Sequence, residues 1–248
     1  MSVLTKPEEF EAMKKAGRLV ALAHQAVRQA VKPGVSSRDL DEIAERVIVE
    51  AGGKPAFKGL YGFPATICAS VNEEVVHGIP NRRKLAEGDI ISVDIGAVVD
   101  GYYGDSAWTY AVGTVDPEVQ KLLAVTEESL YAGIRAAVAG RPLIELSGAV
   151  QDVVEAAGFA VVRDFVGHGI GRNLHEAPQV PNFRMGEPGP TLRKGEALAI
   201  EPMVNIGTHQ VKTKKNGWTV VTGDGKWSAH FEHTIIVQDG EAVITTKL

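Results

Sequence analysis

Four carboxylates and one histidine lie in or beside apolar or glycine-rich stretches, where a side chain is expected to be buried. They are Asp94, Asp105, His168, Glu201 and Glu232. A buried carboxylate is costly unless it is paired or bound to a cation, and four of them carry more negative charge than a protein core tolerates. Oxygen ligands with one nitrogen suit Mn, Fe, Co or Zn, and a set of five ligand side chains can hold two such ions. The sequence therefore favours a hydrolase with two metal ions.

The overall composition is that of a globular protein and excludes few functions. The chain has 248 residues, 44% of them hydrophobic, which is enough for one large domain or two small ones. A net charge of −5 implies no general attraction to nucleic acid. Two short basic runs, 82–84 and 212–215, are interpreted as solvated faces, with contact to RNA or another anionic partner as the alternative.

The sequence also indicates a compartment. Its single cysteine, Cys68, cannot form an internal disulfide, which fits a reducing environment. The N-terminus has neither a charged lead nor an apolar run, so we expect no signal peptide. No uncharged apolar run is long enough to span a bilayer. We therefore expect a cytoplasmic monomer that has no membrane partner.

Apolar residues recur at helical spacing in the first fifty residues. Thr5 and Glu8 form a capping-box pattern, and the helix that they begin should end at the Pro-Gly pair 33–34. A second, shorter helix is expected to start near Ser36 or Ser37 and to end at the glycines 52–53. The first part of the chain thus predicts a long helix, a short helix and then strands.

The second part of the chain repeats this order. Asp116 is a good N-cap for a long helix that stops at Gly140, and a short helix then ends at Gly158. The two short helices align without gaps. Because no linker or low-complexity tract divides the chain, we predict one α+β domain, 1–248, with pseudo-symmetric halves of about 1–115 and 116–248. The active site is expected between the halves.

The strands carry most of the candidate ligands. Two β-rich runs, 90–99 and 102–112, flank Asp100-Gly101, which is a strong hairpin signal. Two further apolar runs, 197–204 and 231–237, are interpreted as strands that are buried on both faces or nearly so.

Asp94 and Asp105 lie on opposite arms of the predicted hairpin, nearly equidistant from its turn. Directly opposed residues of antiparallel strands are roughly 5 Å apart, and two like charges at that separation resist ionisation. A metal pair removes the conflict. The alternative is that Asp105 caps a bulge and Asp94 faces solvent, but flanking residues Val93 and Ile95 argue for burial of Asp94.

The other three candidate ligands are less specific when taken singly. His168 has glycine on both sides, which would let a bulky ligand approach the backbone. Glu201 ends an apolar run and is followed by proline, and Glu232 enters another apolar run. Each glutamate could instead be an ordinary buried carboxylate paired with Arg or Lys, and the histidine could be structural. The joint occurrence favours the metal site.

Two more histidines, His77 and His175, are candidates for binding a substrate carbonyl and stabilising an oxyanion. Surface or helix-capping roles are the alternative for both. His24 is interpreted as a packed residue of the first helix, and Cys68 as an inert thiol in a strand. His209 is left without a role, and His230 and His233 could support the adjacent Glu232. No nucleophile elbow, His-Glu-x-x-His motif or phosphate-binding loop is present.

At this point the sequence resembles the type I methionine aminopeptidases of bacteria, essentially from end to end. The resemblance is carried by four stretches: 70–80 with His77, 93–96 followed by Asp105, 165–183 with His168 and His175, and 200–203 with Glu201. The short interval between Glu201 and Glu232 and the lack of an extension before the first helix match the minimal type I form.

The resemblance implies a pita-bread fold around a dinuclear centre. Asp94 and Asp105 would bind one metal, Asp105 would bridge to the second, His168 and Glu201 would complete the second site, and Glu232 would bridge both. A water or hydroxide held between the ions would attack the first peptide bond, with Glu201 as a candidate for moving its proton.

The resemblance further implies how substrate is held. His77 and His175 would position it and polarise the scissile carbonyl. The methionine pocket would be formed by Phe57, Leu60, Phe63, Cys68, His77, Leu174 and Trp218, an apolar slot suited to a thioether. Leu60 stands where relatives often have Tyr, and Leu174 where they often have Phe, so methionine specificity is still predicted but the shape of the pocket differs. The second residue of the substrate is normally small in this family.

The implied partners are the N-termini of nascent polypeptides and, for a cotranslational role, the ribosome. The nearest rival function is that of a Pro-specific peptidase with the same fold, which usually carries a separate N-terminal domain. A non-catalytic relative that binds peptide, RNA or ribosome is the other alternative, but such proteins typically lose ligands, and all five are present here.

Overall fold

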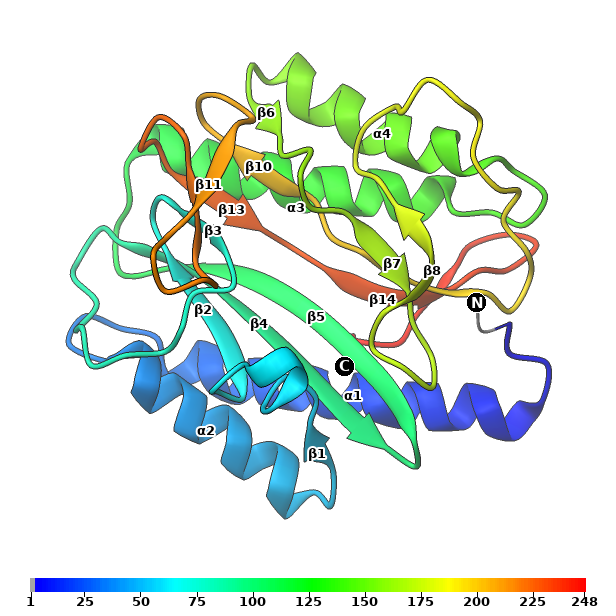
Figure 1. Ribbon diagram of the computed structural model, residues 1–248, viewed down its shortest axis with the longest axis horizontal. Helices are drawn as coiled ribbons and strands as arrows, with labels where there is room; N and C mark the ends of the chain where they lie inside the picture. The colour runs from blue at the N-terminus through cyan, green and yellow to red at the C-terminus, as the bar shows by residue number, and fades with distance from the viewer. Residues whose placement is uncertain (1–2) are drawn as a thin grey trace.

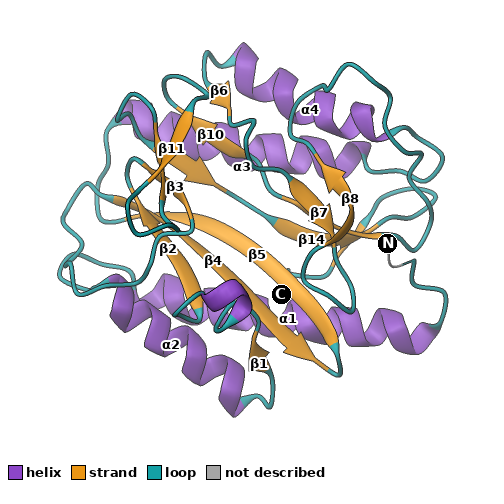
Figure 2. Cartoon of the chain, viewed as in Figure 1, coloured by secondary structure: helices purple, strands orange, loops and turns teal. Residues whose placement is uncertain are grey.

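The computed structural model describes residues 3–248 (Figure 1). Two pairs of helices lie on the outside, and the strands run between them (Figure 2). The helices are α1 (Pro7–Ala30), α2 (Ser37–Glu50), α3 (Pro117–Ala136) and α4 (Leu143–Ala156). Helix α1 packs on α2 and on the strands of the first half, and α3 packs on α4 and on strands of the second half. None of the helices within residues 3–248 combines the length and the apolar character that crossing a bilayer requires.

The strands of the described residues form four small sheets in which neighbouring strands run antiparallel. The first contains β1 (Lys54–Pro55), β2 (Ile67–Val71), β4 (Ile90–Val99) and β5 (Tyr102–Ala111). The second contains β6 (Ala160–Val161), β10 (Met203–Asn205) and β13 (Ser228–His230). The third contains β3 (Glu74–Val76), β11 (Val211–Thr213) and β12 (Val220–Thr222). The fourth contains β7 (Gly167–Gly169), β8 (Glu176–Val180), β9 (Ala197–Ile200), β14 (His233–Ile236) and β15 (Val243–Ile244).

The helix starts follow local hydrogen bonds, and one predicted cap is wrong. The carboxylate of Glu9, not Glu8, accepts hydrogen bonds from the backbone N–H groups of Thr5 at 3.0 Å and Lys6 at 3.2 Å. Pro7 can begin the helix because a proline at the first helical position gives up an N–H that would have no partner there. The second helix begins as predicted, with Ser36 as its N-cap.

The order of elements repeats after 106 residues. This shift carries α2 onto α4 and β1 onto β6, and it places the last residue of α1 on the last residue of α3. It also places Gly34 on Gly140 and Gly52 on Gly158, which are all in the left-handed conformation that glycine adopts without steric cost. The repeat predicted from the short helices therefore extends to the turns and to the first strand of each half.

The predicted hairpin of the first half is confirmed. Strands β4 and β5 pair over their full lengths around Asp100 and Gly101, whose φ angles of 52° and 76° are those of a type I′ turn. The corresponding strands of the second half are not continuous, so the predicted strands 197–204 and 231–237 are wrong in extent. Strand β9 ends before Glu201, and β10 begins after Pro202, which has no N–H to donate to a ladder.

The two halves meet where β5 lies beside residues 230–234, and hydroxyl side chains make the junction. Thr234 Oγ1 accepts from the N–H of Asp105 at 3.0 Å and donates to its C=O at 2.8 Å. Thr109 Oγ1 does the same with the N–H and C=O of His230, at 2.9 and 2.8 Å. Ser106 Oγ donates to the C=O of Glu232 at 2.6 Å. One backbone bond, from the N–H of Glu232 to the C=O of Ala107, adds to them at 2.8 Å. These bonds fix two candidate ligands relative to each other.

Helix α1 approaches β5 closely because both contribute glycine at the contact. A Cβ atom on Gly104 would lie 2.7 Å from the backbone nitrogen of Gly17. About two turns further along the helix, the imidazole of His24 is buried against the same strand, with Nε2 2.8 Å from the C=O of Ser106 and Nδ1 2.9 Å from the hydroxyl of Tyr110. His24 is therefore packed, as its position on the first helix suggested.

The Gly104→Ala variant is expected to lose about 1–3 kcal/mol of unfolding free energy, because its Cβ would force α1 away from β5. Urea unfolding followed by circular dichroism measures this. Gly240→Ala is the matched control, since nothing lies within 4 Å of a Cβ at Gly240 and its φ is not positive. Equal midpoints for the two variants would contradict the packing argument.

Burial lowers the pKa of His24 from 6.5 to about 4, so the folded protein keeps it neutral. As the pH falls below 6.5, His24 takes up a proton in the unfolded chain but not in the folded protein. The stability that comes from keeping His24 neutral is therefore present above pH 6.5 and is lost toward pH 4. Lowering the pH from 7 to 5 should reduce the unfolding free energy by about 2 kcal/mol through His24. Over the same pH interval, the unfolding free energy of the His24→Gln variant should fall by about 2 kcal/mol less than that of the parent. Equal falls in the two proteins would refute the claim that His24 is held neutral.

Candidate metal centre and substrate pocket

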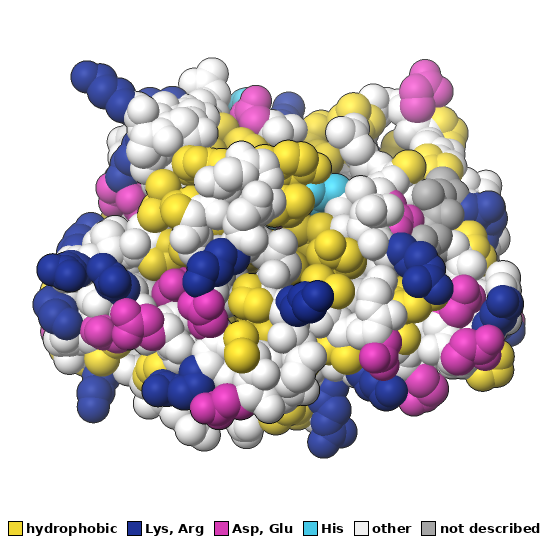
Figure 3. Space-filling view, turned by 60° about the horizontal axis from the view of Figure 1, so that its bottom comes forward, with side chains coloured by type: hydrophobic (Ala, Val, Ile, Leu, Met, Phe, Trp, Pro, Cys, Tyr) yellow, Lys and Arg dark blue, Asp and Glu magenta, His cyan; other side chains and the backbone are white. Residues whose placement is uncertain are grey.

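One cavity of about 260 Å³ gathers the side chains that the sequence singled out. Its lining consists of Phe57, Leu60, Tyr61, Phe63, Cys68, His77, Asp94, Asp105, His168, Leu174, His175, Glu201, Trp218 and Glu232. The space-filling view in Figure 3 shows histidine in a recess that hydrophobic side chains border. Tyr61 is the one member of the lining that sequence reasoning missed.

The two aspartates lie on the same face of the hairpin but are not directly opposed. Asp94 pairs with Ala107 across the ladder, and Asp105 pairs with Gly96, so the carboxylates are diagonal neighbours. The expected distance for opposed residues therefore does not apply. The offset leaves Gly96 opposite Asp105, and a Cβ there would lie 2.6 Å from the ring of Phe57. The glycine thus lets the pocket wall pack beside the aspartates.

The two glutamates come from the interruptions between strands in the second half. Ile200 pairs with His233 and Met203 pairs with His230, so Glu201 and Glu232 fall opposite each other between these pairs. Their backbones leave the ladder here, one strand pair continuing into the five-stranded sheet and the other into a three-stranded sheet. The chain therefore brings two carboxylates to the seam between sheets, next to those of the hairpin.

All four carboxylates are held in conditions that oppose ionisation. Desolvation raises the pKa of Asp94 to about 7 and the pKa of Glu201 to about 7. The pKa values of Asp105 and Glu232, which are 4% and 2% exposed, are raised well above their usual range by burial and then by the charge of neighbouring carboxylates. A cation among them would remove both penalties.

The donor set fits a divalent metal. Oxygen atoms of Asp94, Asp105 and Glu232 are buried and have no hydrogen-bond partner among the described residues. One ligand atom from each of Asp105, His168 and Glu232 lies within 4.8 Å of the others. Within residues 3–248, the ion-pair partners of Asp105 and Glu201 are imidazoles, so the alternative pairing with Arg or Lys is not what the fold provides.

A hydrogen bond from Nδ1 orients the His168 ring so that Nε2 faces the carboxylates. Nδ1 lies 2.9 Å from the C=O of Gly169 and can only donate to it, which leaves the lone pair on Nε2. Nε2 is 3.6 Å from Glu201 Oε1 and 3.9 Å from Asp105 Oδ2. The flanking glycines were expected to let a ligand approach the backbone, but in the structure they let neighbouring strands pack closely. A Cβ on Gly167 or Gly169 would lie 2.3 or 2.2 Å from a backbone oxygen of a neighbouring strand.

His77 and His175 line the same cavity as the candidate ligands. Burial lowers the pKa of His77 to about 4 and also lowers that of His175, so both rings are neutral near pH 7 and can donate an N–H. His77 packs edge-on against Phe165, and His175 packs edge-on against His168 with 4.6 Å between ring centroids. They are fixed donors beside the candidate ligands.

The rest of the cavity is apolar. Phe57, Phe63 and Leu174 are buried, and the rings of Phe63 and Trp218 meet edge to face with centroids 5.1 Å apart. Cys68 is buried opposite Asp94 on the neighbouring strand, and burial raises the pKa of its thiol well above the usual range. The thiol is therefore a wall of the slot and not a nucleophile.

Two residues at the site carried no clear signal in the sequence. Tyr61 is 78% exposed, has a φ of 51° within a short 3-10 turn, η1 (Leu60–Gly62), and lies parallel to the ring of His175 at 6.3 Å. His230 is 2% exposed, and its Nε2 lies 3.6 Å from Glu201 Oε2 with no hydrogen-bond partner among the described residues. The glycines on either side of Tyr61 were the only hint of its turn.

Comparisons with known proteins agree with this geometry. The family model described as metallopeptidase family M24 matches residues 11–239. Methionine aminopeptidase 1 of Bacillus subtilis (strain 168) is 52% identical to this chain over 248 residues, 100% of both proteins. Methionine aminopeptidase of Clostridium perfringens is 48% identical over 99% of both.

Solved structures give the same result. The crystal structure of methionine aminopeptidase from Thermotoga maritima matches with a TM-score of 0.96 and 48% identity, covering 100% of both chains. A prolidase from Pyrococcus furiosus shares only the fold, with a TM-score of 0.77 at 20% identity over 99% of this chain and 66% of its own. The predicted pita-bread fold and the use of divalent metal are confirmed. The chain belongs to metallopeptidase family M24 and, within it, to the bacterial methionine aminopeptidases.

Proposed function

We propose that this hydrolase removes the N-terminal methionine from polypeptides and prefers a small second residue. The observation that carries the proposal is the arrangement of the cavity, where a slot of apolar side chains opens directly onto the carboxylate cluster. An unbranched thioether side chain suits such a slot. The names of the relatives in Bacillus subtilis and Thermotoga maritima support the same substrate.

Two divalent ions, of Co, Mn, Fe or Zn, are the proposed cofactors. Asp94, Asp105, His168, Glu201 and Glu232 would hold them. The buried oxygens without partners and the three ligand atoms within 4.8 Å of one another support this set. When bound, such ions act as Lewis acids toward the substrate and lower the pKa of water toward neutrality.

We propose roles for the other residues of the site, and the positions of their side chains support these roles. Glu201, partly buried and next to His168, would hold and return the proton moved during hydrolysis. The neutral rings of His77 and His175 would donate hydrogen bonds to the carbonyl oxygen of the scissile peptide bond. Phe57, Leu60, Phe63, Cys68, Leu174 and Trp218 would enclose the methionine side chain and exclude water from it.

We also propose that the whole chain acts as a single catalytic domain built from a duplicated unit. The shift of 106 residues supports the duplication, and the split of the candidate ligands between the halves supports one domain. Nascent polypeptide N-termini are the proposed partners, with the protein acting as a cytoplasmic monomer and meeting its substrates at the ribosome.

Peptide selectivity tests the proposed function. The protein loaded with Mn or Co should release methionine from a Met-Gly-x peptide and should leave an x-Pro peptide largely intact, because the slot selects the first side chain. Product release can be followed by chromatography under identical conditions. Preferred cleavage of the x-Pro peptide would instead support the activity of a Pro-specific peptidase, and binding of both without cleavage would support a non-catalytic relative.

Removal of a buried candidate ligand tests the metal centre. Asp105→Ala and Glu232→Ala should each lower metal affinity by at least about 100-fold and abolish turnover, since even outer groups around a metal are worth 10–100-fold. Metal content after dialysis is measured by elemental analysis, alongside peptide turnover. The metal-free variants should remain folded, because removing one of four crowded carboxylates relieves repulsion.

Glu241→Ala is the matched control, since that glutamate is exposed near β15 and lies outside the cavity. It should keep the parent's metal content and turnover. Two metal equivalents retained in either Asp105→Ala or Glu232→Ala would show that the assigned ligands are wrong.

A further inference from the structure

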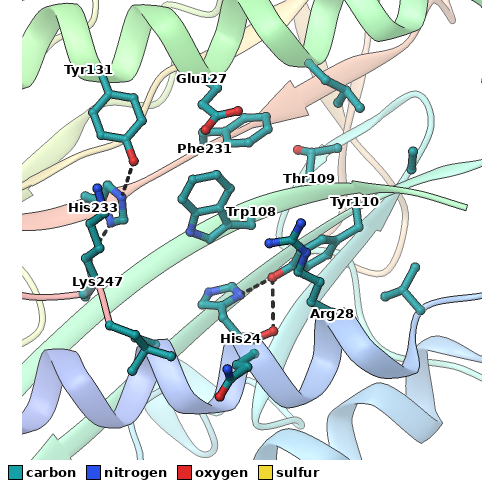
Figure 4. A pocket seen from close by; sticks show the side chains of 17 residues that line it. His24, Arg28, Trp108, Thr109, Tyr110, Glu127, Tyr131, Phe231, His233 and Lys247 are labelled. Atoms are coloured by element: carbon teal, nitrogen blue, oxygen red, sulfur yellow. Dashed lines mark hydrogen bonds between the residues drawn. The ribbon is translucent and has the colours of Figure 1, made fainter.

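A second cavity, of about 730 Å³, lies behind the strands that carry the candidate ligands. Side chains alternate along a strand, so Trp108 and Tyr110 of β5 face away from the side that Asp105 faces. Phe231 and His233 likewise flank Glu232 and line the second cavity. We call it the back cavity. Its two long walls are α1 and α3, one from each half, as Figure 4 shows.

The floor of the back cavity is aromatic. Trp108 lies in the middle, between α1 and α3 (Figure 4). Its ring meets those of Phe231 and His233 edge to face, at 5.0 and 5.4 Å between centroids. Leu123 of α3 and Ala21 of α1 add apolar surface on the two sides. Trp108 is partly exposed, so part of its indole remains accessible to a ligand.

The cationic side chains of this cavity can receive an anion. The lining holds two cations, Arg28 and Lys247, and two acidic groups, the side chain of Glu127, whose pKa is raised by burial, and the terminal carboxylate of Leu248. Lys247 lies over the ring of Tyr131, with Nζ 5.8 Å from the centroid. Arg28 has no salt bridge or hydrogen bond with any other residue in 3–248, and its charge acts on Tyr110 and Glu127 only at longer range. Arg28 is exposed, and its guanidinium can pair with a planar acid whose ring lies against the aromatic floor.

We propose that the back cavity binds a small aromatic anion, with its ring against Trp108 and its carboxylate or sulfonate against Arg28. The volume is within the range of sites that hold molecules of drug size. The ligand would lie on the opposite face of the strands from the peptide, so this site is separate from the proposed peptidase site. The claim concerns binding and does not depend on which peptide the enzyme cleaves.

The test uses a fluorescent probe of this chemistry, 8-anilinonaphthalene-1-sulfonate, titrated into the metal-loaded protein with excess methionine present to fill the front pocket. Saturable binding is expected. Arg28→Gln should weaken it at least tenfold by removing the cation, and Leu123→Trp should weaken it at least tenfold by filling the cavity. Arg46→Gln, which makes the same charge change on an exposed residue of α2, should leave it unchanged.

A neutral dye of similar size, N-phenyl-1-naphthylamine, separates charge from apolar contact. It should bind the parent at least tenfold more weakly than the sulfonate does, and Arg28→Gln should not change its affinity. The proposal is overturned if the sulfonate does not saturate, if either Arg28→Gln or Leu123→Trp binds it as the parent does, or if the neutral dye binds equally well. Peptide turnover, measured separately, is unaffected by these outcomes.

Discussion

The repulsion among four desolvated carboxylates is the constraint on which the rest of this structure depends. Asp94, Asp105, Glu201 and Glu232 line one cavity and have raised pKa values, and buried oxygen atoms of Asp94, Asp105 and Glu232 have no hydrogen-bond partner among the described residues. No sequence would maintain that arrangement for packing alone, because each group would be easier to bury as an amide or an alkyl chain. The fold is best understood as a frame that keeps these oxygens together for a cation.

The frame consists of two similar halves that supply ligands in different ways. The first half uses an uninterrupted hairpin, so Asp94 and Asp105 are held by a regular ladder. The second half interrupts both strands of the equivalent pair, and Glu201 and Glu232 occupy the gaps. The hydroxyl groups of Ser106, Thr109 and Thr234 then join the halves beside the ligands. Small polar side chains suit this junction because they satisfy backbone groups where no regular ladder continues.

Local sequence signals predicted most of the fold. The Asp100-Gly101 turn, the helical periodicities and the stops at Gly34 and Gly140 depend on a few neighbouring residues, and the structure has them where expected. The break at Glu201-Pro202 was missed because the apolar run continues through it. Glu8 was chosen as the capping residue in place of Glu9 because the two are adjacent and only the entry angle of the chain distinguishes them.

The candidate site could be predicted where chemistry conflicted with burial. A carboxylate within an apolar strand, such as Asp94, is conspicuous in the sequence because the core should reject it. His230 and Tyr61 carry no such conflict. The position of His230 near Glu201 depends on the contact between strands far apart in sequence, and the exposed ring of Tyr61 depends on a turn that glycine permits. The roles of the aligned pocket residues came from resemblance and not from any physical pattern in the chain.

Because the candidate ligands are divided between the two halves, metal binding should affect how quickly the protein is degraded in a cell. A divalent ion bound at the seam would bind the folded protein and not the separated halves, so it would add to the free energy of unfolding in proportion to the logarithm of the metal concentration. Proteases act on the unfolded fraction. The abundance of this protein should therefore follow the supply of its metal, and starvation for metal would deplete the protein as well as its activity.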